Sequence, residues 1–303
     1  MLSSTLKRSS VLLGTAALLA ASALTGPAGA QSASAYPQYT ALGDSYAAGA
    51  GVPNSSGGAC MRSDHNYGSL VATGLGVANY RDVTCSGAKT AHLSAAQGDD
   101  APAQLNAVTA DTDLVTLTMG GNDLGTSVLG VVDVIGACLV AGVTDWLGEP
   151  CHDVYADRRF DVGTWSWVWE NDQLIARINA TGPQLGAEIQ KIKARAPGAK
   201  VLLVGYPSVF PDNEWTCFGK QPLAVGDVAY LRGIIVRLNT MLATTAAANG
   251  AAYVDTLTPT KGHDICSDQR WVEGLIPGSP AVPFHPNAAG ESAMANAVLT
   301  ALQ

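Results

Sequence analysis

Basic residues are scarce in this chain of 303 residues. It contains 17 lysines and arginines against 25 aspartates and glutamates, so its formal net charge at pH 7 is −8. Proteins that bind nucleic acid gather basic residues on one face or along one helix, and no such cluster follows Lys7 and Arg8. The sequence therefore predicts no nucleic-acid partner, and an anionic polymer would be repelled.

Long apolar runs and metal-binding patterns are also absent. The apolar stretch over residues 11–24 is shorter than the roughly 20 residues that a helix needs to span a bilayer. The cysteines include no CxxC pair, and no two histidines share the i, i+4 spacing of a zinc protease. We expect neither a membrane span nor a metal or other cofactor. The histidines set aside in this way are His65, His92, His152 and His263.

The first residues carry the three parts of a secretory signal. Lys7 and Arg8 precede the apolar stretch, and the small residues of "GPAGAQSASA" follow it. We predict a signal peptide over residues 1–30, with residue 35 as the alternative cleavage point, and hence a secreted, extracellular protein. An even number of cysteines then predicts three disulfides, although six cysteines allow fifteen pairings. The six are Cys60, Cys85, Cys138, Cys151, Cys217 and Cys266.

No Pro/Ser-rich spacer, charge run or internal repeat divides the rest of the chain. Hydrophobic residues make up 47% of the sequence, enough for a sizeable core. We therefore predict one domain over residues 36–303, with an insertion around residues 126–172, and we expect a monomer.

Short apolar runs alternate with segments of helical periodicity. Strands are predicted at 39–42, 77–83, 113–121, 199–207 and 251–256, and helices at 173–194, 226–248 and 288–302. Strands that are apolar throughout and alternate with helices indicate an α/β fold, a parallel sheet covered on both faces. Ligands of such sheets bind beyond the carboxyl ends of the strands, so the residues that follow each strand are the candidates for a site.

Three motifs follow the first three predicted strands. "GDS" places Ser45 after the first, "TCSGAKT" places Gly87 after the second, and "MGGNDLG" places Asn122 after the third. A serine becomes a nucleophile when it has a base within reach and donors for the oxyanion that it creates. The glycine offers a backbone N–H and the asparagine a side-chain amide. Read alone, each motif is also ordinary turn chemistry.

A candidate base stands near the C-terminus in "PFHPN". His285 precedes Asn287, a suitable N-cap for the last helix, so the imidazole is expected at a helix N-terminus. A positive helix end lowers the imidazolium fraction, which suits a base that must start neutral.

The four motifs together resemble those of the GDSL, or SGNH, hydrolase family, and they span Gly43 to Asn287. The six cysteines resemble its secreted actinobacterial lipases and esterases. The resemblance implies a three-layer α/β/α, flavodoxin-like fold with a five-stranded parallel sheet. It implies Ser45 as nucleophile, His285 as general base, and an oxyanion hole made by the Ser45 and Gly87 N–H groups and the Asn122 side chain. The pairing that it implies is Cys60 with Cys85, Cys138 with Cys151, and Cys217 with Cys266.

One position departs from the family pattern, which has an aspartate three residues before the histidine. Here that position is Val282. The histidine still needs an acceptor for its second ring nitrogen. Some secreted relatives use a main-chain carbonyl, and we favour the carbonyl of Val282 or Pro283. The alternative is a carboxylate from "HDICSD", Asp264 or Asp268.

The predicted insertion contains "TWSWVWEND". If this segment is extended, Trp165, Trp167 and Trp169 share one face. They would then form a wall for acyl chains or sugars, or would simply cover the core beneath a long loop.

The sequence thus predicts a secreted serine hydrolase that cleaves carboxylic esters through an acyl-enzyme. The alternative is a noncatalytic lipid- or polysaccharide-binding module on the same fold. Within the esterases, lipase, phospholipase A1, acetyl-carbohydrate esterase and plant-polyester hydrolase all stay open.

Overall fold

A five-stranded parallel sheet forms the centre of the computed structural model, which describes residues 1, 34–56, 58–127 and 130–303. Every pair of neighbouring strands in this sheet is parallel, so the predicted α/β architecture is confirmed. In spatial order the strands are β2 (Asn79–Asp82), β1 (Gln38–Gly43), β3 (Leu114–Thr118), β6 (Lys200–Val204) and β7 (Ala252–Val254). The predicted signal peptide lies outside the described residues, apart from Met1.

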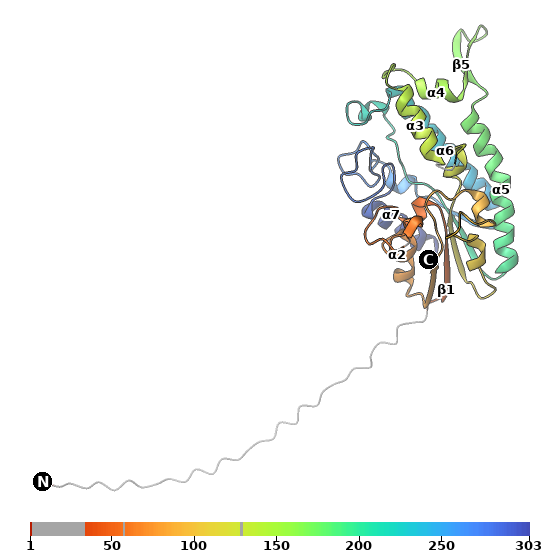
Figure 1. Ribbon diagram of the computed structural model, residues 1–303, viewed down its shortest axis with the longest axis vertical. Coiled ribbons are helices and arrows are strands. Elements are labelled where there is room, and N and C mark those ends of the chain that lie inside the picture. Colours follow the sequence, from red (N-terminus) through yellow and green to blue (C-terminus); the bar gives the residue numbers. More distant parts are fainter. Residues whose placement is uncertain (2–33, 57, 128–129) are drawn as a thin grey trace. The chain divides into compact units, whose positions relative to one another are not determined.

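Helices cover both faces of the sheet (Figure 1). One face packs against α2 (Tyr67–Leu75) and α7 (Ala288–Ala301), and the other against α5 (Gln173–Arg195) and α6 (Val225–Ala248). Alternate residues of each strand point to opposite faces. In β3, Leu114 therefore joins the α2/α7 core, whereas Val115 joins the α5/α6 core. Because both faces are buried, β3 and β6 consist of leucine, valine and buried threonine, apart from Lys200 at the start of β6.

Side-chain caps set the starts of two long helices. Asp172 accepts the Ile175 N–H at 3.0 Å before α5, and Asn287 accepts the Gly290 N–H at 3.2 Å before α7. The second cap is the one expected from the sequence. It places the chain segment that carries His285 at the start of α7.

The insertion contains more regular structure than expected from the sequence. It forms α3 (Val131–Ala141), α4 (Pro150–Tyr155), and an antiparallel hairpin of β4 (Asp157–Asp161) and β5 (Ser166–Glu170). Figure 1 shows the hairpin projecting beyond α4.

Short segments and disulfides complete the fold. The three cysteine pairs are those that the family resemblance implies: Cys60 with Cys85, Cys138 with Cys151, and Cys217 with Cys266.

Ser34–Gln303 form one compact unit, and no helix among its described residues is long and apolar enough to cross a membrane. The short helices are α1 (Ser45–Ala48) and the 3₁₀ segments η1 (Gly58–Cys60), η2 (Thr90–Leu93), η3 (Gln104–Ala107), η4 (Gly121–Leu124), η5 (Glu214–Cys217) and η6 (Thr258–Thr260).

Candidate active site

Ser45 is the first residue of α1, immediately past the carboxyl end of β1. The chain turns at Gly43, where φ is +149° and an added Cβ would lie 2.6 Å from the Ala47 Cβ and 2.7 Å from the Thr118 carbonyl oxygen. Only glycine fits such a position. The Gln104 side chain accepts the Gly43 N–H at 2.8 Å and donates to the Gly43 carbonyl at 2.9 Å. The turn that presents Ser45 is therefore held from both sides.

Asp44 is buried beside the serine and ties several strand ends together. It accepts the Tyr46 N–H at 3.0 Å, the backbone contact expected of a turn residue, and also the Tyr206 hydroxyl at 2.5 Å. The same hydroxyl accepts the Gly121 N–H at 2.8 Å. One tyrosine thus connects the ends of β1, β3 and β6. Burial raises the pKa of Asp44 to about 7, and these hydrogen bonds offset part of that rise.

His285 lies between Ser45 and a main-chain carbonyl. Its Nε2 is 2.7 Å from the Ser45 Oγ, and its Nδ1 is 2.8 Å from the Pro283 carbonyl oxygen. A carbonyl oxygen can only accept a hydrogen bond, so Nδ1 must carry the hydrogen. Nε2 is then left as the acceptor that faces the serine hydroxyl.

The other candidate acceptors for the His285 Nδ1 have different hydrogen-bond or ion-pair partners. The Val282 carbonyl accepts the His285 backbone N–H at 3.1 Å. Asp264 accepts the Cys266 N–H at 2.9 Å, and Asp268 forms a 3.1 Å ion pair with a lysine. Among the described residues, the Pro283 carbonyl is the acceptor at Nδ1.

The imidazole of His285 is 6% exposed, and this burial lowers its pKa. Its hydrogen bond to the Pro283 carbonyl acts in the opposite direction with smaller effect. The position of His285 at a helix N-terminus predicted a low imidazolium fraction, whereas the larger cause in the structure is burial. The Tyr46 ring packs 4.7 Å from the imidazole centroid and contributes to that burial. Its hydroxyl donates to the Phe284 carbonyl at 2.5 Å and so holds the histidine loop.

Gly87 and Asn122 lie in two separate turns, after β2 and after β3, that a hydrogen bond joins. The Asn122 Nδ2 donates to the Ala88 carbonyl at 3.0 Å, and its Oδ1 accepts the Val131 N–H at 3.2 Å. This leaves the second Nδ2 hydrogen uncommitted. Gly87 has a φ of +77°, and its N–H has no acceptor among the described residues. The Ser45 N–H, as the first of a helix, has no partner within the helix.

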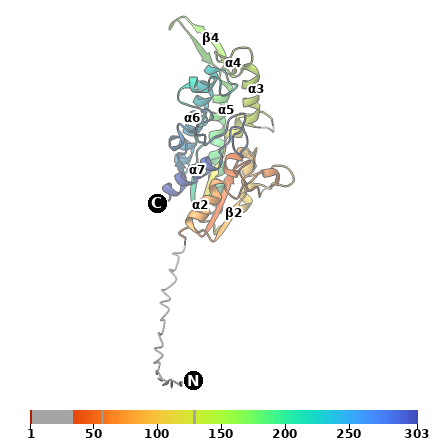
Figure 2. The same ribbon diagram turned by 90° about the vertical axis from the view of Figure 1, so that its left-hand side faces the viewer.

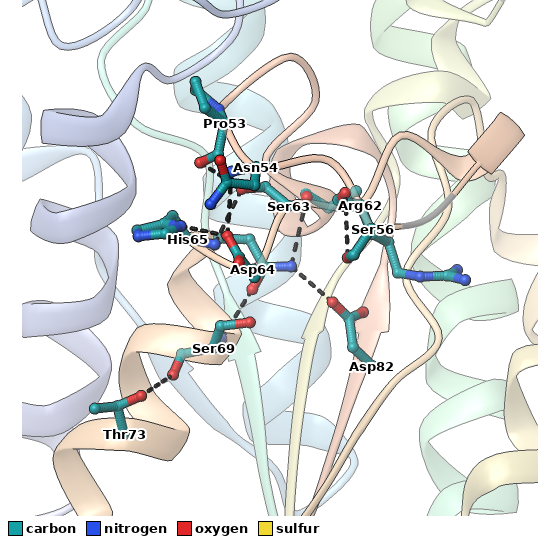
Figure 3. Close-up of polar contacts among 12 residues, drawn as sticks. Pro53, Asn54, Ser56, Arg62, Ser63, Asp64, His65, Ser69, Thr73 and Asp82 are labelled. Atoms are coloured by element: carbon teal, nitrogen blue, oxygen red, sulfur yellow. Dashed lines mark hydrogen bonds and ion pairs between the residues drawn. The ribbon is translucent and has the colours of Figure 1, made fainter.

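A loop over residues 53–66 braces the turn that holds Gly87. Asp64 accepts a backbone N–H of the same loop at 3.1 Å, and Figure 3 shows Arg62 at the side of this loop. Arg62 donates to the Thr84 carbonyl at 2.7 Å, and a disulfide joins the loop to the start of the turn. The position of Gly87 therefore depends on covalent and polar contacts outside the sheet.

An apolar cavity of about 330 Å³ opens beside the serine and the histidine. Its walls come from α3, α6 and the loops after β6 and before α7. Gly87 is not among its lining residues, whereas Asn122 is. The apolar walls include Val131, Ile135, Leu139, Leu231, Ile234 and Leu238. Such a lining suits an aliphatic group bound beside the Ser45 hydroxyl.

Most of the chain is similar to known hydrolases. It matches the model of the GDSL-like Lipase/Acylhydrolase family over residues 41–293. The chain belongs to this family. Lipase 2 of Streptomyces coelicolor is 41% identical over 270 residues, 87% of this chain and 85% of that protein.

Two solved structures are similar along almost their full length. Phospholipase A1 from Streptomyces albidoflavus NA297 is 29% identical with a TM-score of 0.67, and the extracellular lipase of Streptomyces rimosus is 27% identical with a TM-score of 0.68. Each match covers 88% of this chain and 99% of the other. The resemblance inferred from the motifs is confirmed, and the protein is a carboxylic ester hydrolase. These likenesses favour an enzyme over the noncatalytic binding module.

The tryptophans of this hydrolase do not form the expected wall of the site. None of the three lines the cavity, whose wall from the insertion is α3 instead. Trp165 and Trp167 are 80% and 58% exposed, so they do not cover the core either. Only Trp169 packs inward, where its ring stacks on His152 at 3.9 Å.

Three residues of the hydrolase that support the site escaped the sequence reasoning. Tyr206 lies two residues past the end of β6, and the rule that singled out Ser45 at a strand end could have found it. Gln104 and Tyr46 had no such signal. Their contacts with Gly43 and Phe284 join residues 61 and 238 positions apart.

Within the described residues of the hydrolase, no three His, Cys, Asp or Glu side chains gather as a metal site.

Proposed function

We propose that this hydrolase cleaves the acyl esters of lipids through an acyl-enzyme, with Ser45 as nucleophile and His285 as general base. The observation that carries the proposal is the relay Ser45 Oγ, His285 and Pro283 carbonyl, with contacts of 2.7 and 2.8 Å at the mouth of an apolar cavity. These distances lie within hydrogen-bond reach for proton transfer between a nucleophile and its base.

In the first half-reaction, Nε2 of His285 takes the hydroxyl proton while the Ser45 Oγ bonds to the ester carbonyl carbon. The carbonyl oxygen becomes an oxyanion, which the N–H groups of Ser45 and Gly87 and the Asn122 amide stabilise. The imidazolium then gives its proton to the departing alcohol. Water repeats the cycle on the acyl group and releases the acid.

The Pro283 carbonyl replaces the aspartate of a triad in this scheme. It accepts the Nδ1 hydrogen, which keeps the imidazole in the tautomer that can receive the serine proton. A carbonyl dipole stabilises the imidazolium less than a carboxylate does, because it carries no full charge. The bond to the Pro283 carbonyl raises the pKa of His285, but by less than burial lowers it.

The cavity supports a lipid acyl chain as the group held beside Ser45. At about 330 Å³ it is at the low end of the roughly 300–1,000 Å³ typical of ligand pockets, and its lining is aliphatic. An acetyl group would leave most of this apolar surface uncovered. Among the esterase classes that the sequence left open, these features favour lipase and phospholipase A1, the names of the similar proteins.

We further propose that the protein is secreted after removal of residues 1–30 and acts as a monomer with one domain over residues 36–303. Support comes from the three disulfides, which persist in oxidising compartments, and from the extracellular lipase among its relatives.

Replacing the proposed nucleophile tests the mechanism. Ser45→Ala should reduce turnover of a soluble p-nitrophenyl ester on the order of 10⁶-fold, as the loss of a catalytic serine does. It should also abolish labelling by a fluorophosphonate probe. The control is Ser292→Ala, which removes an exposed hydroxyl on α7 and should change neither readout. A Ser45→Ala enzyme that kept a tenth of the activity would rule out the assignment.

A further inference from the structure

Exposed apolar side chains are concentrated on one part of this hydrolase. Of the sixteen large hydrophobic side chains that are exposed among the described residues, ten lie between Val132 and Trp167, within the insertion. Three more are Trp215, Phe218 and Ile276. Isolated exposed apolar residues need no explanation, whereas a cluster of them marks a surface that meets another body.

The β4–β5 hairpin is amphipathic. In its register Arg158 lies opposite Trp169, and Phe160 lies opposite Trp167, so these four side chains share one face. Trp165, in the turn, packs edge-on against Phe160 with ring centroids 6.1 Å apart.

The opposite face of the hairpin is polar. Arg159 pairs with Glu170 at 2.6 Å, and Asp157 accepts the Asn171 side chain at 2.8 Å. The two faces therefore differ as the two sides of a sheet do when one side packs against a core.

The aromatic face of the hairpin has no core beneath its outer half. Phe160, Trp165 and Trp167 are 38%, 80% and 58% exposed. Only the base is anchored, where Trp169 stacks on His152 and the same imidazole stacks on the Tyr230 ring of α6 at 4.0 Å. Figure 2 shows the two strands extending past α4. The outer half of the hairpin thus presents bare indoles on an anchored support.

The exposed apolar residues of the insertion reach the cavity at α3, where Val132 is 52% exposed and lines the cavity. Tyr230, which holds the hairpin base, precedes Leu231, a residue of the cavity wall. The Val225 N–H at the start of the same helix donates to the Trp146 carbonyl at 3.0 Å, and the Trp146 ring stacks on the exposed Phe218 at 5.1 Å. Exposed aromatic groups thus flank the helix that lines the cavity.

The charge of the insertion limits the kind of surface that the aromatic face of the hairpin can bind. Residues 126–172 contain eight acidic residues and two arginines, a formal net charge of −6. An anionic membrane would therefore be repelled. Indole rings favour the boundary between water and lipid, because one edge is polar and the rest is apolar. Arg158, stacked 5.1 Å from the Trp167 ring centroid, places one cation among these rings, within the aromatic face.

We propose that the aromatic face of the β4–β5 hairpin docks this hydrolase onto a lipid surface without net charge, that of a zwitterionic phospholipid. Docking brings the cavity mouth close to the acyl chains, which are the substrate in the proposed function. The inference therefore rests on the proposed function. The indoles of Trp165 and Trp167 insert at the headgroup level, and the opposite, polar face of the hairpin stays in water.

The test compares binding with hydrolysis in the full protein. Trp165→Ala/Trp167→Ala should lower the fraction that sediments with phosphatidylcholine vesicles, weakening partitioning by about tenfold or more. Hydrolysis of vesicle-bound ester should fall by a similar factor. Hydrolysis of a soluble, short-chain p-nitrophenyl ester should stay within about twofold, because neither tryptophan lines the cavity.

The matched control is Thr164→Ala/Ser166→Ala, which changes polar side chains of the same hairpin. It should retain vesicle binding and both activities. Circular dichroism of both variants checks the fold. Added phosphatidylglycerol should weaken binding of the wild-type protein, because it makes the vesicles anionic.

Several results would overturn the proposal: no binding of the wild-type protein to phosphatidylcholine, or equal binding by the tryptophan variant. A wild-type dimer that this variant converts to a monomer would show that the face binds a second copy instead. Binding to xylan or cellulose that the variant loses would assign the face to a polysaccharide. Failure of the proposed function would look different, since the wild-type protein would then leave the soluble ester intact while still binding vesicles.

Discussion

The serine–histidine site and the β4–β5 hairpin have opposite relations to solvent. At the site, polar side chains are buried: Asp44, Ser45 and His285 are 1%, 7% and 6% exposed, and each has a hydrogen-bond partner. On the hairpin, apolar side chains are exposed, and Trp165 and Trp167 contact little beyond Phe160 and Arg158.

The difference follows from what each kind of group needs. A buried polar group costs free energy unless a partner replaces water, and here the chain itself supplies the partners. An exposed indole costs free energy in water until another surface covers it, and the described chain leaves Trp165 and Trp167 80% and 58% exposed. The partners of the buried polar groups at the site are therefore all within the protein. The exposed rings of the hairpin, in contrast, indicate a partner outside the protein.

The largest effect after loss of the serine is expected at Asn122. Asn122→Ala should reduce kcat by roughly 10²–10³-fold, because it removes one donor to the oxyanion. KM for a soluble ester should change little, since the donor acts in the transition state. The control is Asn296→Ala on the exposed side of α7. A loss confined to KM would show that the amide only binds substrate.

The buried carboxyl of Asp44 should make the free energy of unfolding depend on pH. Its folded-state pKa of about 7 lies above the ~3.9 of an unfolded chain, so its contribution to stability is lost as pH rises through 7. Between pH 5 and 8 this loss amounts to on the order of 2 kcal/mol. Asp44→Asn should remove that part of the pH dependence in urea unfolding.

Tyr206→Phe provides the comparison for Asp44. It removes the hydroxyl that donates to Asp44 but leaves the carboxyl, so the pH dependence should persist and the folded-state pKa should rise further. Equal slopes for the wild-type protein and Asp44→Asn would place the titration elsewhere.

The pH profile of activity should report His285. Its burial lowers the pKa below the ordinary value of 6.5, and only the neutral imidazole can accept the serine proton. kcat/KM should therefore fall about tenfold per pH unit below an apparent pKa that is less than 6.5, and level off above it. Asp44→Asn should leave this acid limb in place. An apparent pKa above 7 would contradict the assignment to a desolvated histidine.

The smallest effect is expected on the hairpin. Trp167→Ala should change the free energy of unfolding by less than about 0.5 kcal/mol, since surface substitutions away from special contacts usually do no more. Trp169→Ala should cost more, because this ring packs on His152. Chemical unfolding of the two variants compares the outer half of the hairpin with its base. Equal losses would show that the outer indoles belong to the folded core.

Most of the fold could be predicted because its central strands are buried on both faces. β3 and β6 are rich in leucine and valine, and α5 and α6 repeat apolar residues at helical spacing. The hairpin gave no such pattern. β4 is "DRRFD", four of whose five residues are charged, and its strand conformation depends on pairing with β5 rather than on its own composition.

The sequence by itself determined which side chains with reactive groups the protein contains. It also determined the order in which they follow the strands along the chain. Motif residues are side chains with distinctive chemistry, so Ser45, Gly87, Asn122 and His285 could be named without coordinates. Only the tertiary structure decided which group accepts the hydrogen bond from the His285 Nδ1 and where the tryptophan side chains point. Every residue has a carbonyl, so the choice of Pro283 follows from backbone geometry that no side-chain motif encodes. The exposure of Trp167 likewise depends on what lies beside it in space: its ring contacts Phe160 and Arg158 and still stays 58% exposed.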